Sequence, residues 1–277
     1  MALELTNTYT KTALSNTLGF SRDLFYYDYD LEEKDLIIVS QILDLYEEDD
    51  SLGAKKVSRL LGIGKNRCQR IMNKYGIHPR RKKGIYKYSG KSDTTFKNVL
   101  LEQDLDTFPD IYFSDYFEFK LADKTEVHGC FVLKYSTRQI TALIFDYFED
   151  SSLIVKALEE TKEYLKGEGI FHSDQGSVYG SDVTVIRIKD LGLQISMSRA
   201  GTPTDNGYAE RFVGIFKLAV VEKRLYYTLG DFLNEALKWI NFYNEKRPHE
   251  SLGHISPNDK AREIGEKSVY INRVFRV

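Results

Sequence analysis

An aspartate interrupts the apolar face of a predicted strand near the middle of this sequence. In the segment DIYFSDYFEFK, Asp115 falls on the same face as four apolar residues, because side chains two positions apart share one side of a strand. A carboxylate buried among apolar side chains is costly unless it is paired, so Asp115 should bind a cation or hold a metal ion. A buried ion pair, or a strand end open to water, is the alternative interpretation. The apolar residues of this face are Ile111, Phe113, Phe117 and Phe119.

A second aspartate follows a short apolar segment. In the stretch FHSDQGSVYGSD, His172 stands two residues before Asp174, and Gly176 stands two residues after it. Carboxylates at strand ends often only form turns, but many α/β enzymes hold a metal ion there. His172 shares a strand face with Asp174. It therefore either orients the carboxylate, contacts a phosphate, or is a hydrogen-bonded histidine of the core.

These side chains need a sheet to position them, and the pattern after residue 104 predicts one. Alternating and apolar runs predict strands over 110–120, 128–134, 138–148, 170–174 and 194–198. Helical patterns occupy 151–169, 207–224 and 230–245, and 181–193 is a helix or a mixed segment. Three meander strands followed by alternating helices and strands are typical of an RNase H-like α/β domain.

Charge is distributed unevenly along the 277 residues. The first fifty residues carry a net −9, whereas residues 51–100 hold 14 Lys and Arg against one Asp, a net +13. Such a block indicates a phosphate-binding surface; a solvated basic linker is the alternative. Helical spacing in 30–48, and two short helices around the turn GIG at 62–64, predict a helix-turn-helix. Its second helix, followed by a basic run, offers DNA-binding side chains: Lys65, Asn66, Arg67, Arg70, Arg80, Arg81, Lys82 and Lys83.

Composition excludes several other classes of protein. No apolar run approaches the roughly 20 residues of a membrane span. The first twenty residues lack the basic and apolar regions of a signal peptide. Cys68 and Cys130 stand 62 positions apart, which suggests neither a disulfide framework nor a cysteine zinc site. We expect a cytoplasmic protein that associates with the nucleoid when bound to DNA.

Three motifs in the second half carry a resemblance to a known family. FHSDQGSVY resembles the HSDxGxQY stretch of transposases encoded by the second reading frame of a large insertion-sequence family. SRAGTPTDNGYAERFVGIFK resembles the SRxGNPxDNAxxExFxxxLK stretch of the same proteins, and NFYNEKRPHESLGHISP resembles their YNxxRPHxxLGxxTP stretch. These transposases belong to the retroviral integrase superfamily. The resemblance covers roughly residues 50–260.

The resemblance implies a catalytic triad that also binds metal: Asp115, Asp174 and Glu210. Thirty-five residues separate Asp174 from Glu210, the spacing usual in this superfamily. Two Mg²⁺ ions, with Mn²⁺ as a substitute, would support phosphoryl transfer. Asp205 and Asn206 are expected to cap the helix of Glu210. Lys217 and Arg247 are further DNA-binding candidates, and His249 is a second orienting candidate; a solvated lysine and a structural turn are their alternatives.

The sequence therefore predicts an insertion-sequence transposase subunit that cleaves element ends and joins them to target DNA. Its domains are an N-terminal extension (1–29), a helical DNA-binding region (30–83), a basic linker (84–104), the integrase-like core (105–260) and a C-terminal tail (261–277). Expected partners are double-stranded DNA, further copies of the chain, and an upstream-frame DNA-binding product or fusion, without a membrane. A catalytically decayed DNA-binding protein or repressor is the main alternative, and a nuclease acting on RNA–DNA hybrids is a weaker one.

Overall fold

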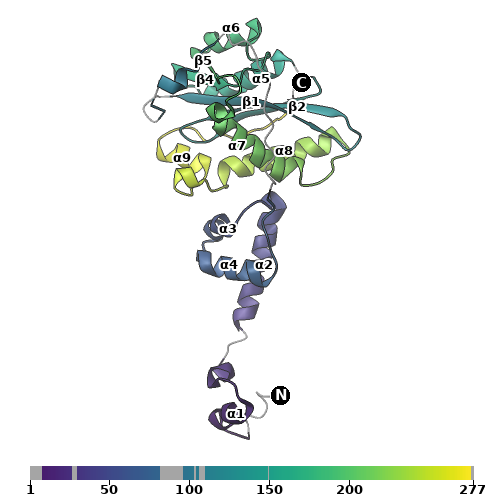
Figure 1. The fold of residues 1–277 in the computed structure, drawn as a ribbon, viewed down its shortest axis with the longest axis vertical. Coiled ribbons are helices and arrows are strands. Elements are labelled where there is room, and N and C mark those ends of the chain that lie inside the picture. The colour runs from purple at the N-terminus through teal and green to yellow at the C-terminus, as the bar shows by residue number, and fades with distance from the viewer. Residues whose placement is uncertain are drawn as a thin grey trace.

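The computed structural model describes residues 8–26, 30–81, 96–102, 104–105, 110–148 and 150–275. Figure 1 shows a sheet covered by helices at one end of the molecule and the helices α2–α4 next to it. The short helix α1 (Lys11–Leu18) lies farthest from the sheet. Lys82, Lys83 and most of the predicted basic linker lie outside the described residues.

The sheet has five strands in the order β3-β2-β1-β4-β5. The first three strands pair antiparallel, whereas β4 pairs parallel with both β1 and β5. This mixed topology is RNase H-like, as the sequence predicts. All five strands fall where the apolar and alternating runs place them: β1 (Ile111–Lys120), β2 (Glu126–Lys134), β3 (Ile140–Asp146), β4 (Gly169–Ser173) and β5 (Leu193–Met197).

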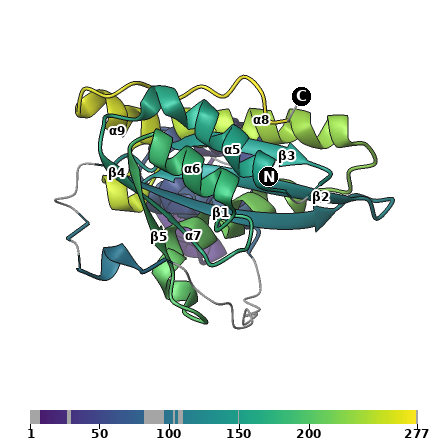
Figure 2. The same cartoon turned by 90° about the horizontal axis from the view of Figure 1, so that it is seen from above.

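Helices cover both faces of the sheet, because both faces are apolar. Tyr112 of β1 packs in a cluster with α5 (Ser151–Thr161) and α6 (Asp182–Asp190), above the sheet in Figure 1. Figure 2 looks down onto these two helices. Phe113 and Phe117 point to the opposite face, where they pack with α7 (Gly207–Phe216) and α8 (Leu229–Glu245). Asp115 shares this second face by the period of two, so it lies on the side of α7.

One helix is shorter than predicted. The helix α5 ends at Thr161 rather than running to residue 169, and a 3-10 turn (Lys162–Tyr164) then leads into extended backbone. Its N-terminal cap is Asp150, whose carboxylate accepts from the Ser152 amide. The helix α7 continues as a π-helical turn over Lys217–Val221, so the chain leaves the helix at about the predicted point.

The described part of the predicted C-terminal tail packs on the sheet domain. After α9 (Pro257–Glu263), Val269, Ile271 and Val274 join the same hydrophobic cluster as α7 and α8. The Phe145 amide of β3 donates to the Val274 carbonyl at 2.8 Å. The segment up to residue 275 is therefore part of the core layer and not a separate tail.

The helices α2 (Asp30–Asp49), α3 (Ala54–Leu60) and α4 (Lys65–Lys74) form a second hydrophobic cluster, which we call the helical unit. The turn between α3 and α4 passes through Gly62 at φ 65°, a left-handed conformation that favours glycine. Buried Ile42, Val57 and Ile71 hold the three helices together. Phe242 of α8 belongs to the same cluster, so the helical unit and the sheet domain share apolar contacts.

A buried ion pair fastens the helical unit to the sheet domain. Nε of Arg247, just after α8, donates to Oδ2 of Asp49 at 2.8 Å, and the two side chains are 4% and 0% exposed. Asp49 also accepts hydrogen bonds from the backbone and hydroxyl of Ser51. Water reaches neither charge, so each depends on the other for its compensation.

We expect Arg247→Met to lower the free energy of unfolding by about 3–5 kcal/mol, because it leaves the Asp49 charge buried and unpaired. Adding Asp49→Asn should recover most of that loss, since the second change removes the charge that lost its partner. Arg262→Met is the control: Arg262 pairs with Glu245 at the surface, where an ion pair contributes at most about 1 kcal/mol. Urea denaturation of the wild type and these three variants measures the free energies of unfolding. Equal losses in Arg247→Met and Arg262→Met would contradict this account.

Candidate active site

Strand register brings the two aspartates to one level of the sheet. In the parallel pairing of β1 with β4, Phe113 lies opposite His172. Asp115 stands two residues after Phe113, and Asp174 stands two residues after His172. The two aspartates therefore lie side by side on the same face of the sheet. Asp174 comes directly after β4 ends at Ser173, and both carboxylates are partly buried. The carboxyl end of β4 and the middle of β1 therefore form one acidic edge.

Glu210 reaches this edge from the first turn of α7, which covers the same face of the sheet. The buried residues Ala209, Phe212 and Phe216 fix the helix against the sheet and leave Glu210 exposed. Its charge acts on Asp115, and the charge of Asp174 acts on Glu210. The three predicted carboxylates therefore influence one another electrostatically, although no two of them are neighbours in the sequence.

Burial and mutual repulsion raise the pKa values of the three carboxyl groups. Burial, and then the Asp174 charge, raise the pKa of Asp115 to about 7, with a smaller contribution from Glu210. Burial raises the pKa of Asp174, although a hydrogen bond from the Gly176 amide opposes it. Burial and the Asp174 charge raise the pKa of Glu210. Like charges held this close are stabilised by a cation.

The donor set suits a hard divalent cation. Carboxylate oxygens are the ligands that Mg²⁺ prefers, and two or three of them suffice when water completes the shell. Burial and the Asp174 charge raise the pKa of Asp115, and a bound cation would favour the charged form of this carboxylate. Within the described ranges, however, no three His, Cys, Asp or Glu side chains converge closely enough to hold one ion in common.

His172 is a core histidine. It is fully buried, with Nδ1 at 2.9 Å from the Ser196 hydroxyl and Nε2 at 3.1 Å from the Ser198 hydroxyl. Burial lowers the pKa of His172 to about 4, so the ring is neutral at pH 7. The ring ties β4 to the segment after β5, and of the roles considered for it, the hydrogen-bonded core is the one that this geometry supports.

The predicted caps of the Glu210 helix serve other purposes. Asp205 makes a two-pronged ion pair with Arg199, Oδ2 to Nε at 2.9 Å and Oδ1 to Nη2 at 2.9 Å, and this partner lowers the pKa of Asp205 to about 2. Asn206 occupies the cap position without a capping hydrogen bond. Its Nδ2 instead donates to the Ser114 carbonyl at 3.0 Å, next to Asp115. The Asp-Asn pair before a helix suggests a cap; nothing local in the sequence points to that strand.

Four predicted DNA-binding residues lie on α4, and all four are exposed. Lys65 and Asn66 are at its first turn, away from the buried face. Arg67 and Arg70 both reach Asp35 of α2, which is 1% exposed; Arg70 pairs with it at 2.8 Å and Arg67 lies at 3.7 Å. Arg70 therefore compensates a buried charge, and its contact with DNA stays a prediction.

Several other basic candidates also have structural partners. Arg80 pairs with Asp50 at 2.8 Å and donates to the Glu222 carbonyl, whereas Arg81 is exposed. Lys217 lies 5.6 Å above the Phe117 ring and its charge acts on Asp115. Arg247, a predicted DNA contact, is buried and pairs with Asp49 through Nε. His249, the second orienting candidate, lines a cavity beside Arg247.

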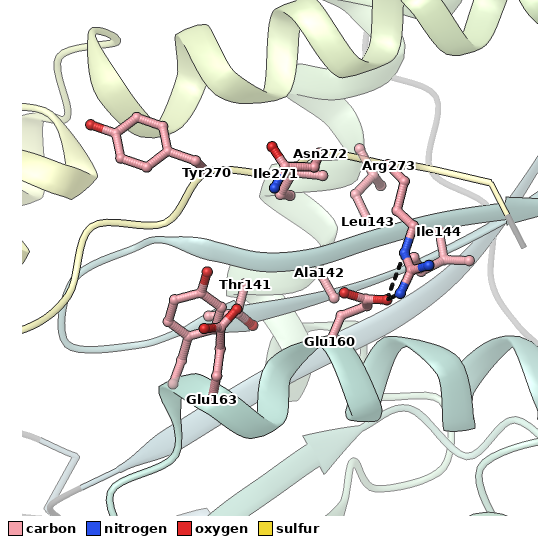
Figure 3. A pocket seen from close by; sticks show the side chains of 11 residues that line it. Thr141, Ala142, Leu143, Ile144, Glu160, Glu163, Tyr270, Ile271, Asn272 and Arg273 are labelled. Carbon is pink, nitrogen blue, oxygen red and sulfur yellow. Dashed lines mark hydrogen bonds and ion pairs between the residues drawn. The ribbon is translucent and has the colours of Figure 1, made fainter.

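A cavity of about 350 Å³ opens at the opposite edge of the sheet (Figure 3). It lies between the edge strand β3, the end of α5 and the segment 270–273. Arg273 crosses it to Glu160 at 2.6 Å. The strand β2 separates β3 from β1 in the sheet, and none of the three carboxylates lines this cavity, so it forms no part of the carboxylate site.

Comparisons with known proteins identify similar proteins encoded by insertion elements. Residues 191–257, which include Glu210, match the integrase core domain family. A 31.7 kDa protein of insertion element IS407 from Burkholderia multivorans is 22% identical over 88% of this chain and 87% of its own length. The transposase of IS904 from Lactococcus lactis is 36% identical over 35% of this chain and 39% of its own length.

The chain is therefore similar to insertion-sequence transposases, and part of it matches the integrase core domain family. The catalytic core domain of HTLV-2 integrase, solved in complex with magnesium, aligns at a TM-score of 0.43 with 16% identity, over 53% of this chain and 92% of that domain. The RNase H-like fold of this chain rests on its own strand order. Among its described helices, none is both long and apolar enough to cross a membrane.

We expect Asn206→Asp to lower the free energy of unfolding by about 1–3 kcal/mol, because aspartate keeps the shape of asparagine but has no N–H for the buried Ser114 carbonyl. Asn206→Ala should cost a similar amount. Thr204→Ala, at an exposed neighbouring position, should change stability by less than about 0.5 kcal/mol. Chemical denaturation decides; a neutral Asn206→Asp protein would show that this bond does not anchor α7.

Proposed function

We propose that this chain is the catalytic subunit of a transposase that cleaves the ends of its element and joins them to target DNA in a Mg²⁺-dependent reaction. The observation that carries the proposal is the parallel register of β1 and β4, which sets Asp115 level with Asp174 under the helix that bears Glu210. The similarity to insertion-sequence transposases suggests the reaction class, and the raised pKa of Asp115 supports a site made for cations.

Asp115, Asp174 and Glu210 would hold two Mg²⁺ ions, or Mn²⁺ in their place. When bound, such ions stabilise the attacking and leaving oxygens of a phosphoryl transfer. The chain itself supplies rigid placement: Asp115 sits on the central strand, and Asp174 is fixed by the hydrogen bond from the Gly176 amide at 3.0 Å.

Neighbouring residues keep the carboxylates in place for two successive reactions, with water and then a DNA 3′-hydroxyl as nucleophile. Asn206 ties the start of α7 to the strand residue before Asp115. Lys217, about two turns after Glu210, partly offsets the negative charge at Asp115. The same lysine is a candidate contact for a DNA phosphate as the substrate approaches.

The proposed DNA partner would be held by the helical region 30–83 together with the basic linker 84–104. Lys65, Asn66, Arg67 and Arg81 are exposed on the helical unit, and Lys82 and Lys83 extend the basic run in the sequence. Further copies of the chain, and an upstream-frame product or fusion, would complete the assembly on DNA. A bacterial cytoplasm with nucleoid association is the matching location.

The test is strand cleavage and joining by the purified protein with Mg²⁺ and the ends of its own element. We expect Asp115→Asn, Asp174→Asn and Glu210→Gln each to reduce joined product below detection while end binding persists, because each removes one of three charges that act as a unit. Double variants should be no worse than single ones for the same reason. Chelation of Mg²⁺ should abolish the activity of the wild-type protein in the same way.

Asp190→Asn is the matched control, since Asp190 is exposed at the end of α6 on the other face of the sheet. Its joining activity should equal that of the wild type. Joining by Asp174→Asn at the wild-type rate would refute the assignment of the site. A wild-type protein that binds the ends but never cleaves them would instead identify the decayed DNA-binding protein.

We expect the double variant Lys65→Ala and Arg67→Ala to weaken binding to a DNA duplex and to reduce the slope of log affinity against log salt by about 2. Lys74→Ala is the control, because Lys74 pairs with Glu32 at 3.1 Å on the same helix. Fluorescence anisotropy at several salt concentrations gives both slopes. Identical slopes for the wild type and the double variant would exclude α4 as the DNA-binding face.

A further inference from the structure

A second cavity, of about 420 Å³, collects basic side chains between the helical unit and the sheet domain. Its basic lining comes from α3, the β2–β3 turn, α7 and the segment after α8. One carboxylate, Glu250, also lines it, and that group pairs with Lys55 at 2.6 Å. The basic residues of this cavity, which we call the basic pocket, are Lys56, Arg138, Arg211, Arg247 and His249.

Polar atoms in the basic pocket lack partners. Nη1 of Arg247 and Nε2 of His249 are buried without a hydrogen-bond partner among the described residues. The Arg247 side chain is only 4% exposed, so water does not replace the missing partner. A buried donor without a partner is costly, and protein structures rarely leave one. Lys56 and Arg211 also form no ion pair or hydrogen bond with any described side chain. The pocket therefore offers several donors that an incoming acceptor could satisfy together.

The cations of the pocket destabilise one another. Burial, and then the Arg247 charge, lower the pKa of Lys56 to about 7, with a further contribution from Arg211. Burial and the neighbouring positive charges hold the pKa of His249 well below its usual range. Glu250 and Asp49 offset only part of this repulsion. An anion in the pocket would relieve it, as a cation would at the carboxylate site.

The Arg138 guanidinium is fixed by two aromatic rings and a backbone carbonyl. The residue adopts φ 59° in the β2–β3 turn, and its guanidinium lies 4.1 Å from the Tyr135 ring and 4.5 Å from the Tyr208 ring. It also donates to the Tyr135 carbonyl. A guanidinium fixed in this way loses little further freedom on binding, and fixed arginines bind phosphate through paired hydrogen bonds.

We propose that the basic pocket binds a backbone phosphate of DNA, held by Lys56, Arg211 and the unpartnered nitrogens of Arg247 and His249. The inference rests on the proposed function for its choice of DNA. Arg211 follows Glu210 on α7, and Lys56 lies on the first helix of the helix-turn-helix. The basic pocket therefore lies between the helical unit, which bears α4, and the helix that bears Glu210. DNA bound by both parts would bring a backbone phosphate to this pocket, which favours a phosphodiester over a free anion.

The experiment measures the affinity for a short duplex of arbitrary sequence between about 50 and 200 mM salt. Lys56→Gln and Arg211→Gln should each reduce the salt slope by about 1, the value for one phosphate contact. The double variant should also lose about 1 in total, because both residues hold the same phosphate. Two unrelated duplex sequences should weaken by the same factor.

Lys189→Gln is the matched control: it removes one positive charge from an exposed position on α6, on the opposite face of the sheet. Its slope should equal that of the wild type. An unchanged slope in both pocket variants, an equal drop in Lys189→Gln, or an additive drop of about 2 in the double variant would each overturn the proposal. Arg211 is exposed, so Arg211→Gln provides a test even if Lys56→Gln fails to fold.

A titration with inorganic phosphate separates the two sources of a phosphate group. If Lys56→Gln loses binding of inorganic phosphate while its duplex slope stays at the wild-type value, the pocket takes a free anion and the assignment to DNA is wrong. Asp115→Asn distinguishes this proposal from the catalytic one, since it should abolish joining and keep the wild-type slope. Joining by Asp115→Asn would refute the carboxylate site and leave the result for the pocket standing.

Discussion

The parallel pairing of β1 with β4 is the constraint on which the acidic edge depends. Phe113 lies opposite His172, and a shift of one residue would turn Asp174 to the other face of the sheet, away from Asp115. The register is held by more than backbone bonds. His172 is fixed by two serine hydroxyls and lies edge-on to the Phe113 ring at 5.5 Å between centroids. Packing of aromatic and hydrogen-bonded groups therefore determines where the charges meet.

The sequence predicts most of this framework, because its signals are local. Alternation places Asp115 on the apolar face of β1, and that face is the one that α7 covers. The strand and helix order suffices for the RNase H-like topology. Glu210 is different: only the family resemblance points to it, since an exposed glutamate on an amphipathic helix has no distinguishing pattern of its own.

The sequence pattern does not predict ion pairs between residues that are distant in the sequence. Arg247 stands 198 positions from Asp49, and Arg70 stands 35 from Asp35. In the sequence both arginines look like surface cations in basic or polar stretches, because nothing local marks the buried carboxylate that each must compensate. Asp205 likewise has the form of a helix cap, yet Arg199 supplies a stronger partner than a backbone amide. Charge near the core is thus decided by tertiary packing.

The two clusters of like charge share one physical character. At the acidic edge the carboxylates repel one another, and in the basic pocket Arg247 and Arg211 repel Lys56 and favour the neutral form of His249. Both are kept together by the apolar packing of α7, which carries Glu210 and Arg211 as neighbours in sequence. Neither cluster stabilises the free protein, so the apolar packing around them must offset the repulsion within each cluster. Each would gain stability from a ligand of opposite sign. Under the proposed function, metal ions and a DNA phosphate would supply those charges on either side of one helix, so that DNA binding and metal binding would stabilise the same element.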